Sequence, residues 1–330
     1  MIGIKVVTSL GFKLKQIKGS KELDVFDCHF SNPLGLAAGL DKNGDYIDNL
    51  ASLGFGFLEI GTVTPKPQYG NKKPRLFRDI PSKAIINRMG FNNKGVDHLV
   101  DKLKKRRSDI PIGVSIGKNA DTPNNLAHAD YLYCLDRVFK YADYVAINIS
   151  SPNTQGLREF EIKDELANLI QALKERQLYL AKKSEYKPLL VKISPDNDEK
   201  SIENICEILL KFSIDGLICT NTSINHNHIS GSGGLSGQPL TEPSTVTLRI
   251  ARKFLGDEFP IIASGGVMSK EDYQNKIHAG ADLVQIYTGF IYEGPKLIDD
   301  ILNHKFLNYF IFVLDRSPSS ELYTVKEISL

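Results

Sequence analysis

The feature that most constrains the fold of this chain is a recurring order of short apolar segments and helical patterns. Eight apolar, β-rich segments occur along the sequence, and most are followed by a polar or glycine-containing turn and then a helical pattern. Apolar runs of this kind are typical of strands that are buried on both faces. The predicted strands are residues 34–38, 56–60, 112–116, 144–149, 189–193, 216–219, 261–264 and 283–287.

The alternation of these strands with helical segments predicts an α/β fold, a (β/α)8 TIM barrel in one domain. A doubly wound sheet is the alternative, but it requires a glycine-rich fingerprint after the first strand, and GLAAGLDKNG does not follow G-x-G-x-x-G. Two long excursions, residues 62–92 and 223–236, interrupt the alternation, and such excursions in a barrel are usually functional. The predicted helices are residues 46–53, 95–105, 127–141, 162–183, 201–212, 244–254 and 270–279.

Composition excludes several classes of protein. The 330 residues carry 41 Lys and Arg against 39 Asp and Glu, a net charge of +2 that gives no nucleic-acid signature. Four scattered cysteines argue against a thiolate metal site or a disulfide framework. No run of about 18 apolar residues occurs, so the sequence predicts a soluble chain or one attached to a membrane surface.

The residues that follow the predicted strands carry the chemistry, because a barrel gathers catalytic groups at the carboxyl ends of its strands. This set is rich in amides and lysines and has almost no carboxylate or histidine, which disfavours a glycosidase and a zinc hydrolase. Amide side chains both donate and accept hydrogen bonds, so they suit a planar, amide-like heterocycle. The set is Asp41, Lys42, Thr62, Lys118, Asn119, Asn148, Ser151, Asn153, Lys192, Thr220, Asn221, Thr222, Gly265, Gly266, Tyr287 and Thr288.

Three further patterns narrow the chemistry. Glycine-rich turns at residues 264–267 and 287–290 favour a phosphate site after the seventh and eighth strands. Lys192 lies within the apolar segment LLVKIS, where burial of its charge is costly unless it meets an anion. Two roles are open: Lys192 forms a Schiff base with a substrate, or it stabilises negative charge on a reduced cofactor ring. Ser151 has no histidine nearby in sequence, and the pair His226 and His228 lacks carboxylate company, so neither a hydrolase triad nor a metal site is predicted.

The sequence resembles the quinone-dependent dihydroorotate dehydrogenases from about residue 32 to about residue 301. The resemblance implies oxidation of (S)-dihydroorotate to orotate, with FMN as cofactor and a quinone as electron acceptor, in pyrimidine biosynthesis. The strings that carry it, in order, are NPLGLAAGLDKNG, GFLEIGTVTPKPQ, GNKKPRLFR, INRMGFNN, IGKN, INISSPNTQGLR, VKISPD, CTNT, GGLSGQPL, IIASGGV and VQIYTGFIYEGP.

The same resemblance assigns expected roles to individual residues. Ser151 matches the catalytic base, where the cytosolic class has cysteine, and Lys192 would offset charge on the reduced flavin rather than form a Schiff base. Tyr287 and Arg78 match positions of the quinone site. The expected FMN-binding residues are Ala38, Lys42, Thr62, Asn148, Lys192, Thr220, Gly237, Gly266, Tyr287 and Thr288. The expected substrate-binding residues are Lys42, Asn87, Arg88, Met89, Gly90, Phe91, Asn148, Asn153, Asn221 and Thr222.

Departures from the family pattern lie at Ser115 and at the two ends of the chain. Ser115 replaces a usual asparagine, which would remove one hydrogen bond to the flavin, worth about 1 kcal/mol. We expect three regions: a short N-terminal extension at 1–30 as a reduced quinone and membrane segment, an FMN-binding barrel at 31–303, and a C-terminal tail at 304–330 that packs on the barrel or supplies an apolar surface.

These ends leave the acceptor and the location open. The resemblance implies a peripheral protein on the cytoplasmic side of the inner membrane, or a cytoplasmic one if membrane attachment is lost with the shortened N-terminus. The alternatives are the same FMN-dependent oxidation with a soluble acceptor, a non-redox Schiff-base lyase that uses Lys192, and a cofactor-free binding relic. No metal or nucleic-acid partner is expected.

Overall fold

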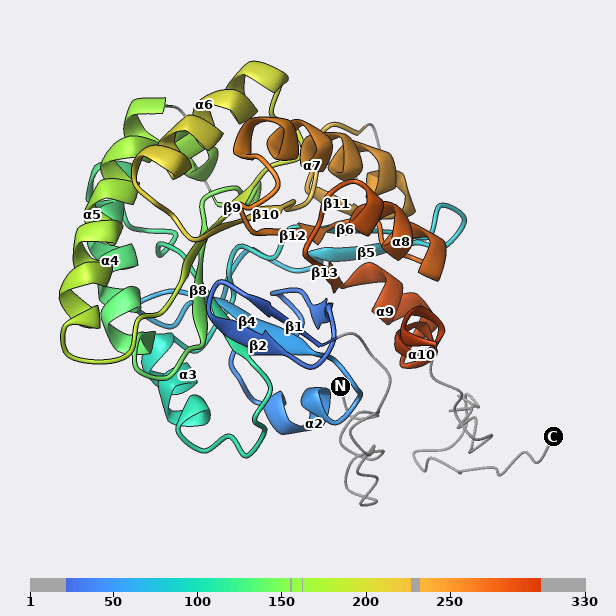
Figure 1. Cartoon of the computed structure of the whole chain (residues 1–330), viewed down its shortest axis with the longest axis horizontal. Coiled ribbons are helices and arrows are strands. Elements are labelled where there is room, and N and C mark those ends of the chain that lie inside the picture. Colours follow the sequence, from blue (N-terminus) through green and yellow to red (C-terminus); the bar gives the residue numbers. More distant parts are fainter. Residues whose placement is uncertain (1–21, 155, 162, 227–231, 304–330) are drawn as a thin grey trace.

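The eight predicted strands form one closed parallel barrel (Figure 1). The computed structural model describes residues 22–154, 156–161, 163–226 and 232–303. Around the barrel the order is β10-β12-β13-β3-β4-β7-β8-β9, so the strands of this barrel follow one another in chain order. The barrel prediction is therefore confirmed. The strands are β3 (Leu34–Leu36), β4 (Phe57–Val63), β7 (Ile112–Ile116), β8 (Tyr144–Asn148), β9 (Leu189–Ile193), β10 (Gly216–Cys219), β12 (Ile261–Ser264) and β13 (Leu283–Ile286).

The seven predicted helical segments are also helices, with shifted ends. Two side-chain caps fix boundaries. Asp198 accepts the Ser201 backbone N–H at 2.8 Å, so the fifth of these helices begins two residues before its predicted start, and Ser269 caps the seventh. The helices are α2 (Ile47–Ala51), α3 (Val96–Leu103), α4 (Ala127–Val138), α5 (Lys163–Ala181), α6 (Glu199–Lys211), α7 (Thr241–Leu255) and α8 (Lys270–His278). Two short helices that the sequence did not predict, α9 (Thr288–Glu293) and α10 (Lys296–Leu302), follow the last barrel strand.

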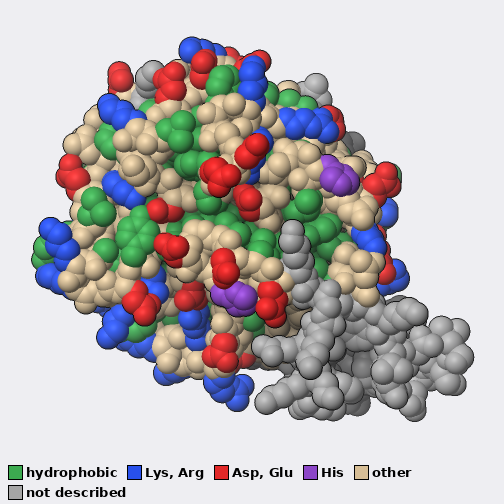
Figure 2. Space-filling view, viewed as in Figure 1, with side chains coloured by type: hydrophobic (Ala, Val, Ile, Leu, Met, Phe, Trp, Pro, Cys, Tyr) green, Lys and Arg blue, Asp and Glu red, His purple; other side chains and the backbone are tan. Residues whose placement is uncertain are grey.

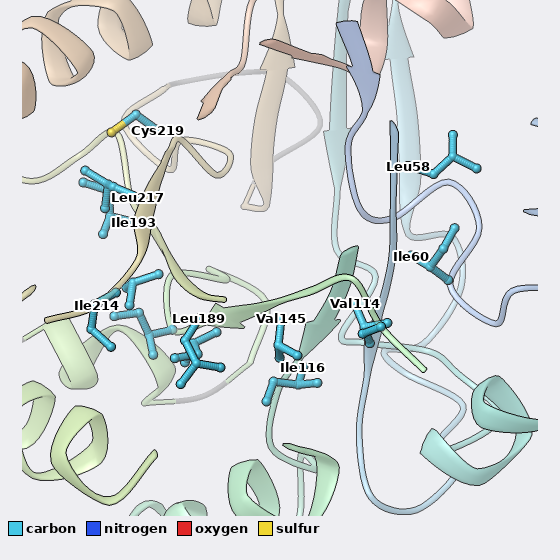
Figure 3. Packing of buried hydrophobic residues seen from close by; sticks show 14 of the residues in the cluster. Leu58, Ile60, Val114, Ile116, Val145, Leu189, Ile193, Ile214, Leu217 and Cys219 are labelled. Carbon is cyan, nitrogen blue, oxygen red and sulfur yellow. The ribbon is translucent and has the colours of Figure 1, made fainter. Parts of the chain in front are cut away.

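Alternate residues of each barrel strand face opposite ways. One set packs outward against the surrounding helices and forms the large apolar core. Figure 3 shows part of this core, with Leu58 and Ile60 of β4 and Leu189 and Ile193 of β9 among the residues that fill it. The alternate set points into the barrel, and its composition changes along the barrel axis.

The amino-terminal end of the barrel interior is closed by apolar side chains. A hairpin of β1 (Leu23–Val25) and β2 (Cys28–Phe30) packs under this end, where the Phe30 and Phe57 ring centroids lie 5.3 Å apart. Gly113 leaves room for Tyr144, because a Cβ at Gly113 would lie 2.0 Å from the Tyr144 Cζ. This end is plugged, so a site inside the barrel has to open at the carboxyl ends of the strands.

A small antiparallel sheet brings the two long excursions together. It has the order β11-β6-β5, built from β5 (Leu76–Asp79), β6 (Ala84–Asn87) and β11 (Gly234–Gly237). Gly234 pairs with Asn87, which places the excursion after β10 against the excursion after β4. The two excursions, which are distant in sequence, therefore lie side by side.

The expected division of the chain at residues 30 and 303 stays a prediction, because residues 1–21 and 304–330 lie outside the described part. Of the helices between residues 22 and 303 that the structure describes, none has both the length and the apolar character needed to cross a bilayer. Figure 2 shows basic and acidic side chains interspersed over the face in view, in line with the net charge of +2.

Candidate active site

A cavity lies at the carboxyl ends of the barrel strands, under the small antiparallel sheet. It encloses about 1000 Å³ of empty space, its open mouth included. Of Ser151 and the residues expected to bind FMN or substrate, all but Arg88 line it. They are Ala38, Lys42, Thr62, Asn87, Met89, Gly90, Phe91, Asn148, Ser151, Asn153, Lys192, Thr220, Asn221, Thr222, Gly237, Gly266, Tyr287 and Thr288.

Amide and hydroxyl side chains at the strand ends are joined in one hydrogen-bonded chain. The Asn148 Nδ2 donates to Thr62 Oγ1 at 2.8 Å, and the Asn221 Nδ2 donates to Asn148 Oδ1 at 3.1 Å. Ser115 does not line the cavity, and its hydroxyl lies 2.8 Å from Thr62 Oγ1. The smaller Ser115 side chain therefore supports Thr62 from behind, and the amides that line the cavity are fixed in orientation.

Ser151 is buried at the start of the segment that follows β8, with 6% of its surface exposed. Its Oγ accepts the Asn153 backbone N–H at 3.4 Å, and the Asn153 Nδ2 donates to Asn87 Oδ1 at 3.0 Å. Asn87 in turn donates to the Gly234 carbonyl at 3.2 Å, so the Ser151 segment is tied to the small sheet. No histidine, aspartate or glutamate lines the cavity among the described residues.

Lys192 enters the cavity floor from β9 and is matched by a buried carboxylate. Its Nζ lies 3.4 Å from Glu59 Oε1, and Glu59 also accepts from Gln285 Nε2 at 2.8 Å and from the Tyr144 hydroxyl at 3.3 Å. Lys192 could be identified from the sequence as a polar residue within an apolar strand, whereas Glu59 and Gln285 were not predicted. Glu59 in GFLEIG and Gln285 in LVQIY carry the same signal.

Lys42 is the second lysine of the cavity. Its Nζ donates to the Gly39 carbonyl at 2.7 Å, and burial, together with nearby Arg75, lowers the pKa of Lys42 to about 8. The turn that carries it is fixed by Asp41, a carboxylate that accepts the backbone N–H groups of Asp45 at 3.0 Å and Tyr46 at 2.7 Å. Lys42 thus places a positive charge at the cavity where it can pair with an anion, and it loses its proton at moderately alkaline pH.

The Gly265–Gly266 turn after β12 lies against the start of α7. Gly266 has a positive φ of 73°, and a Cβ there would lie 2.2 Å from Thr241 Cα. The Thr241 Oγ1 donates to the Gly266 carbonyl at 2.7 Å. Only glycine fits this close approach of two backbones, so the turn is held tightly against the start of α7.

Some predicted residues lie away from the cavity. Arg88 stacks on the Phe77 ring, with its Cζ 4.7 Å from the centroid, and Arg78 stacks on Tyr292 at 5.1 Å. His226, for which no metal role was predicted, contacts the Gly233 carbonyl at 2.9 Å, and residue 228 lies outside the described residues. Within the described ranges, no group of three or more His, Cys, Asp or Glu comes together as metal ligands would.

Comparison with known proteins agrees with this arrangement. A family model described as dihydroorotate dehydrogenase matches residues 21–306. The chain belongs to the dihydroorotate dehydrogenase family.

Two curated members of the dihydroorotate dehydrogenase family show how far the similarity extends. Dihydroorotate dehydrogenase (quinone) of Aliivibrio salmonicida is 50% identical over 304 residues, covering 90% of each chain. Dihydroorotate dehydrogenase (quinone) of Shewanella sp. strain MR-4 is 54% identical over 280 residues, covering 83% of each chain. The crystal structure of DHODH from Eimeria tenella in complex with ferulenol superposes with a TM-score of 0.85 at 36% identity, covering 92% of this chain and 89% of that one. The likeness therefore spans the whole barrel.

Proposed function

We propose that this chain oxidises (S)-dihydroorotate to orotate with FMN bound in the barrel cavity and passes the electrons to a quinone, as a step of pyrimidine biosynthesis. The observation that carries the proposal is the cavity itself, a plugged barrel whose open end is lined by amides, hydroxyls and two lysines in a chain of the dihydroorotate dehydrogenase family. The reaction removes a proton from C5 and a hydride from C6 of the substrate, so the site has to supply a base and a hydride acceptor.

Three features of the cavity support FMN as the cofactor. The Gly265–Gly266 turn offers a cradle for the phosphate at the position where barrels commonly bind one. The hydrogen-bonded amides and Lys192 suit a heterocycle with donor and acceptor edges, and the buried Gln285 Oε1, on a residue that lines the cavity, has no hydrogen-bond partner. FMN, when bound, supplies the hydride acceptor. The residues that would hold it are Ala38, Lys42, Thr62, Asn148, Lys192, Thr220, Gly237, Gly266, Tyr287 and Thr288.

The substrate would lie between the cofactor and the small sheet. Asn87 and Asn153, already joined at 3.0 Å, present amide groups there together with Asn148, Asn221 and Thr222. Fixed amides can hold a planar ring in one orientation, which contributes to the rate by positioning. Lys42 would pair with the substrate carboxylate. Arg88 would act on the loop 89–91 rather than on the substrate, because it does not line the cavity.

Ser151 would accept the proton from C5. Its burial excludes bulk water, and the hydroxyl lies in a segment tied to β6 and β11 through Asn153 and Asn87. The ion pair with Glu59 supports the charge-stabilising role of Lys192 and disfavours a Schiff-base lyase, because an amine has to lose its proton before it attacks a carbonyl.

We propose a quinone rather than a soluble oxidant as the acceptor, and a peripheral contact with the cytoplasmic face of the inner membrane. Both rest on the resemblance to quinone-dependent relatives and on Ser151 in place of cysteine. Initial rates with dihydroorotate and ubiquinone, fumarate or NAD decide the acceptor. We expect turnover with ubiquinone to exceed that with the two soluble acceptors by at least about tenfold. Equal or faster turnover with fumarate or NAD contradicts the proposal.

The lowered pKa of Lys42 leads to a testable pH dependence of product binding. Because the Lys42 pKa is about 8, its ammonium form predominates below that pH and is lost as the pH rises above it. The Kd of orotate, measured from the change in flavin absorbance, is expected to rise up to about tenfold per pH unit above pH 8. In Lys42→Met the affinity is expected to be weak and independent of pH between about 7 and 9.5.

An exposed lysine serves as the control for this pH dependence. Lys94 pairs with Asp45 at 2.8 Å on the surface, so Lys94→Met should keep the wild-type pH profile. If the orotate affinity of the Lys42→Met protein still falls above pH 8, the pH dependence belongs to another group.

A further inference from the structure

A buried polar layer separates the apolar plug of the barrel from the cavity. Glu59, Lys192 and Gln285 each lie two residues after an inward-facing apolar residue of the plug, namely Phe57, Leu190 and Leu283. Strand alternation therefore places all three inside the barrel, one level closer to the cavity. Lys192 and Gln285 line the cavity, and Glu59 lies behind them.

Burial of the Glu59 carboxylate costs free energy at this position. It has 0% of its surface exposed, and its carboxylate contacts Lys192 at 3.4 Å, Gln285 at 2.8 Å and Tyr144 at 3.3 Å. Burying an ion pair gives little net stability, and apolar residues of similar volume often serve a core equally well or better. Packing alone therefore does not account for a carboxylate beneath the cavity floor.

We propose that Glu59 is a positioning residue that holds the Lys192 ammonium at the cavity floor and offsets part of its positive charge, so that the bound flavin is reduced less easily than Lys192 alone would make it. The inference rests on the proposed function, because it concerns the cofactor assigned there. Physically, the negative charge that the ring acquires on reduction is stabilised by the local positive potential, and Glu59 lowers that potential. A flavin with a lower midpoint potential passes its electrons on to the acceptor more readily.

The charge-removing variant Glu59→Gln keeps the size of the side chain and tests the inference directly. We expect two-electron reduction of its bound flavin to become about tenfold more favourable, a rise in midpoint potential of about 30 mV for a two-electron couple. The measurement is anaerobic equilibration of the holoenzyme against a reference dye of known potential. Sulfite, which adds to the flavin ring and leaves negative charge on it, should bind with a Kd about tenfold lower than in the wild type.

Glu161→Gln is the matched control, because it makes the same change at another buried carboxyl. Glu161 accepts from the Ser194 backbone N–H at 2.7 Å and from Asn197 at 3.0 Å, and it does not line the cavity. A loss of stability without a change in the flavin midpoint potential is expected in Glu161→Gln.

If the Glu59→Gln protein does not fold, the variant Tyr144→Phe tests the role of Glu59 instead. It removes one donor to Glu59 and leaves the carboxylate less screened, so flavin reduction should become about threefold less favourable.

The outcomes separate the two proposals. A wild-type protein that carries no flavin overturns the proposed function and this inference together. A flavin-bearing wild type whose potential and sulfite affinity are unchanged in Glu59→Gln, or in Tyr144→Phe where that variant decides, overturns the role of Glu59 and leaves the proposed function standing. A shift of similar size in Glu161→Gln also overturns it, because the effect would then reflect general loosening of the barrel.

Discussion

Ser151→Ala is expected to keep its bound FMN and yellow colour and to lose about 10³-fold in the rate at which dihydroorotate bleaches the flavin. The reason is that proton transfer by a positioned group contributes roughly 10²–10⁴-fold to a rate, and no other acidic or basic side chain besides the two lysines and Tyr287 lines the described cavity. Rapid mixing of the oxidised protein with dihydroorotate, followed by flavin absorbance, measures this step apart from the acceptor.

Ser151→Cys is the matched variant for this experiment. A thiol restores a proton acceptor at the same position, so it should recover part of the lost rate with a different pH profile. Flavin reduction at the wild-type rate in Ser151→Ala would remove Ser151 from the role of base.

Gly266→Ala is expected to weaken FMN binding by about 100-fold. The new Cβ would lie 2.2 Å from Thr241 Cα, a backbone atom that cannot rotate away, so the turn has to move and its cradle changes shape. FMN affinity, measured by fluorescence quenching on adding FMN to the stripped protein, reports the loss.

Gly256→Ala separates this effect from backbone strain alone. Gly256 also has a positive φ, of 78°, but no atom lies within 4 Å of a Cβ placed there. This variant should lose about 1 kcal/mol of stability and bind FMN normally. Equal FMN affinity in the two variants would mean that the Gly266 turn does not bind the phosphate.

The barrel could be predicted from sequence because its strands are buried on both faces. Segments such as Ile112–Ile116 and Leu189–Ile193 are near-continuous apolar runs, each interrupted by a single polar residue, and the structure reproduces their predicted bounds. The small sheet could not be predicted in the same way. Strand β5 alternates between exposed and half-buried residues, and β11 reads GLSG, with almost no strand-forming residues. Its partner β6 lies about 150 residues away in sequence, so only the closed barrel brings the two together.

The residues of the candidate site likewise fall into those that the barrel strands position and those that the small sheet positions. Residues at strand ends, such as Asn148 and Thr220, could be placed because the barrel dictates where strands end. Asn87 and Gly237 were placed only through the family resemblance, and their position in the cavity depends on the unpredicted sheet. Glu59 was overlooked, although Lys192 needed an anionic partner. Nothing in a single sequence indicates which carboxylate crosses a barrel to meet a lysine 133 residues away.

The most direct test of the proposed function is an anaerobic titration of the purified protein with dihydroorotate, followed by flavin absorbance and by orotate formation. We expect the protein to carry FMN, dihydroorotate to bleach it, and about one orotate to appear per flavin. A protein without flavin, or a bound flavin that stays oxidised in excess dihydroorotate, would contradict the proposed function.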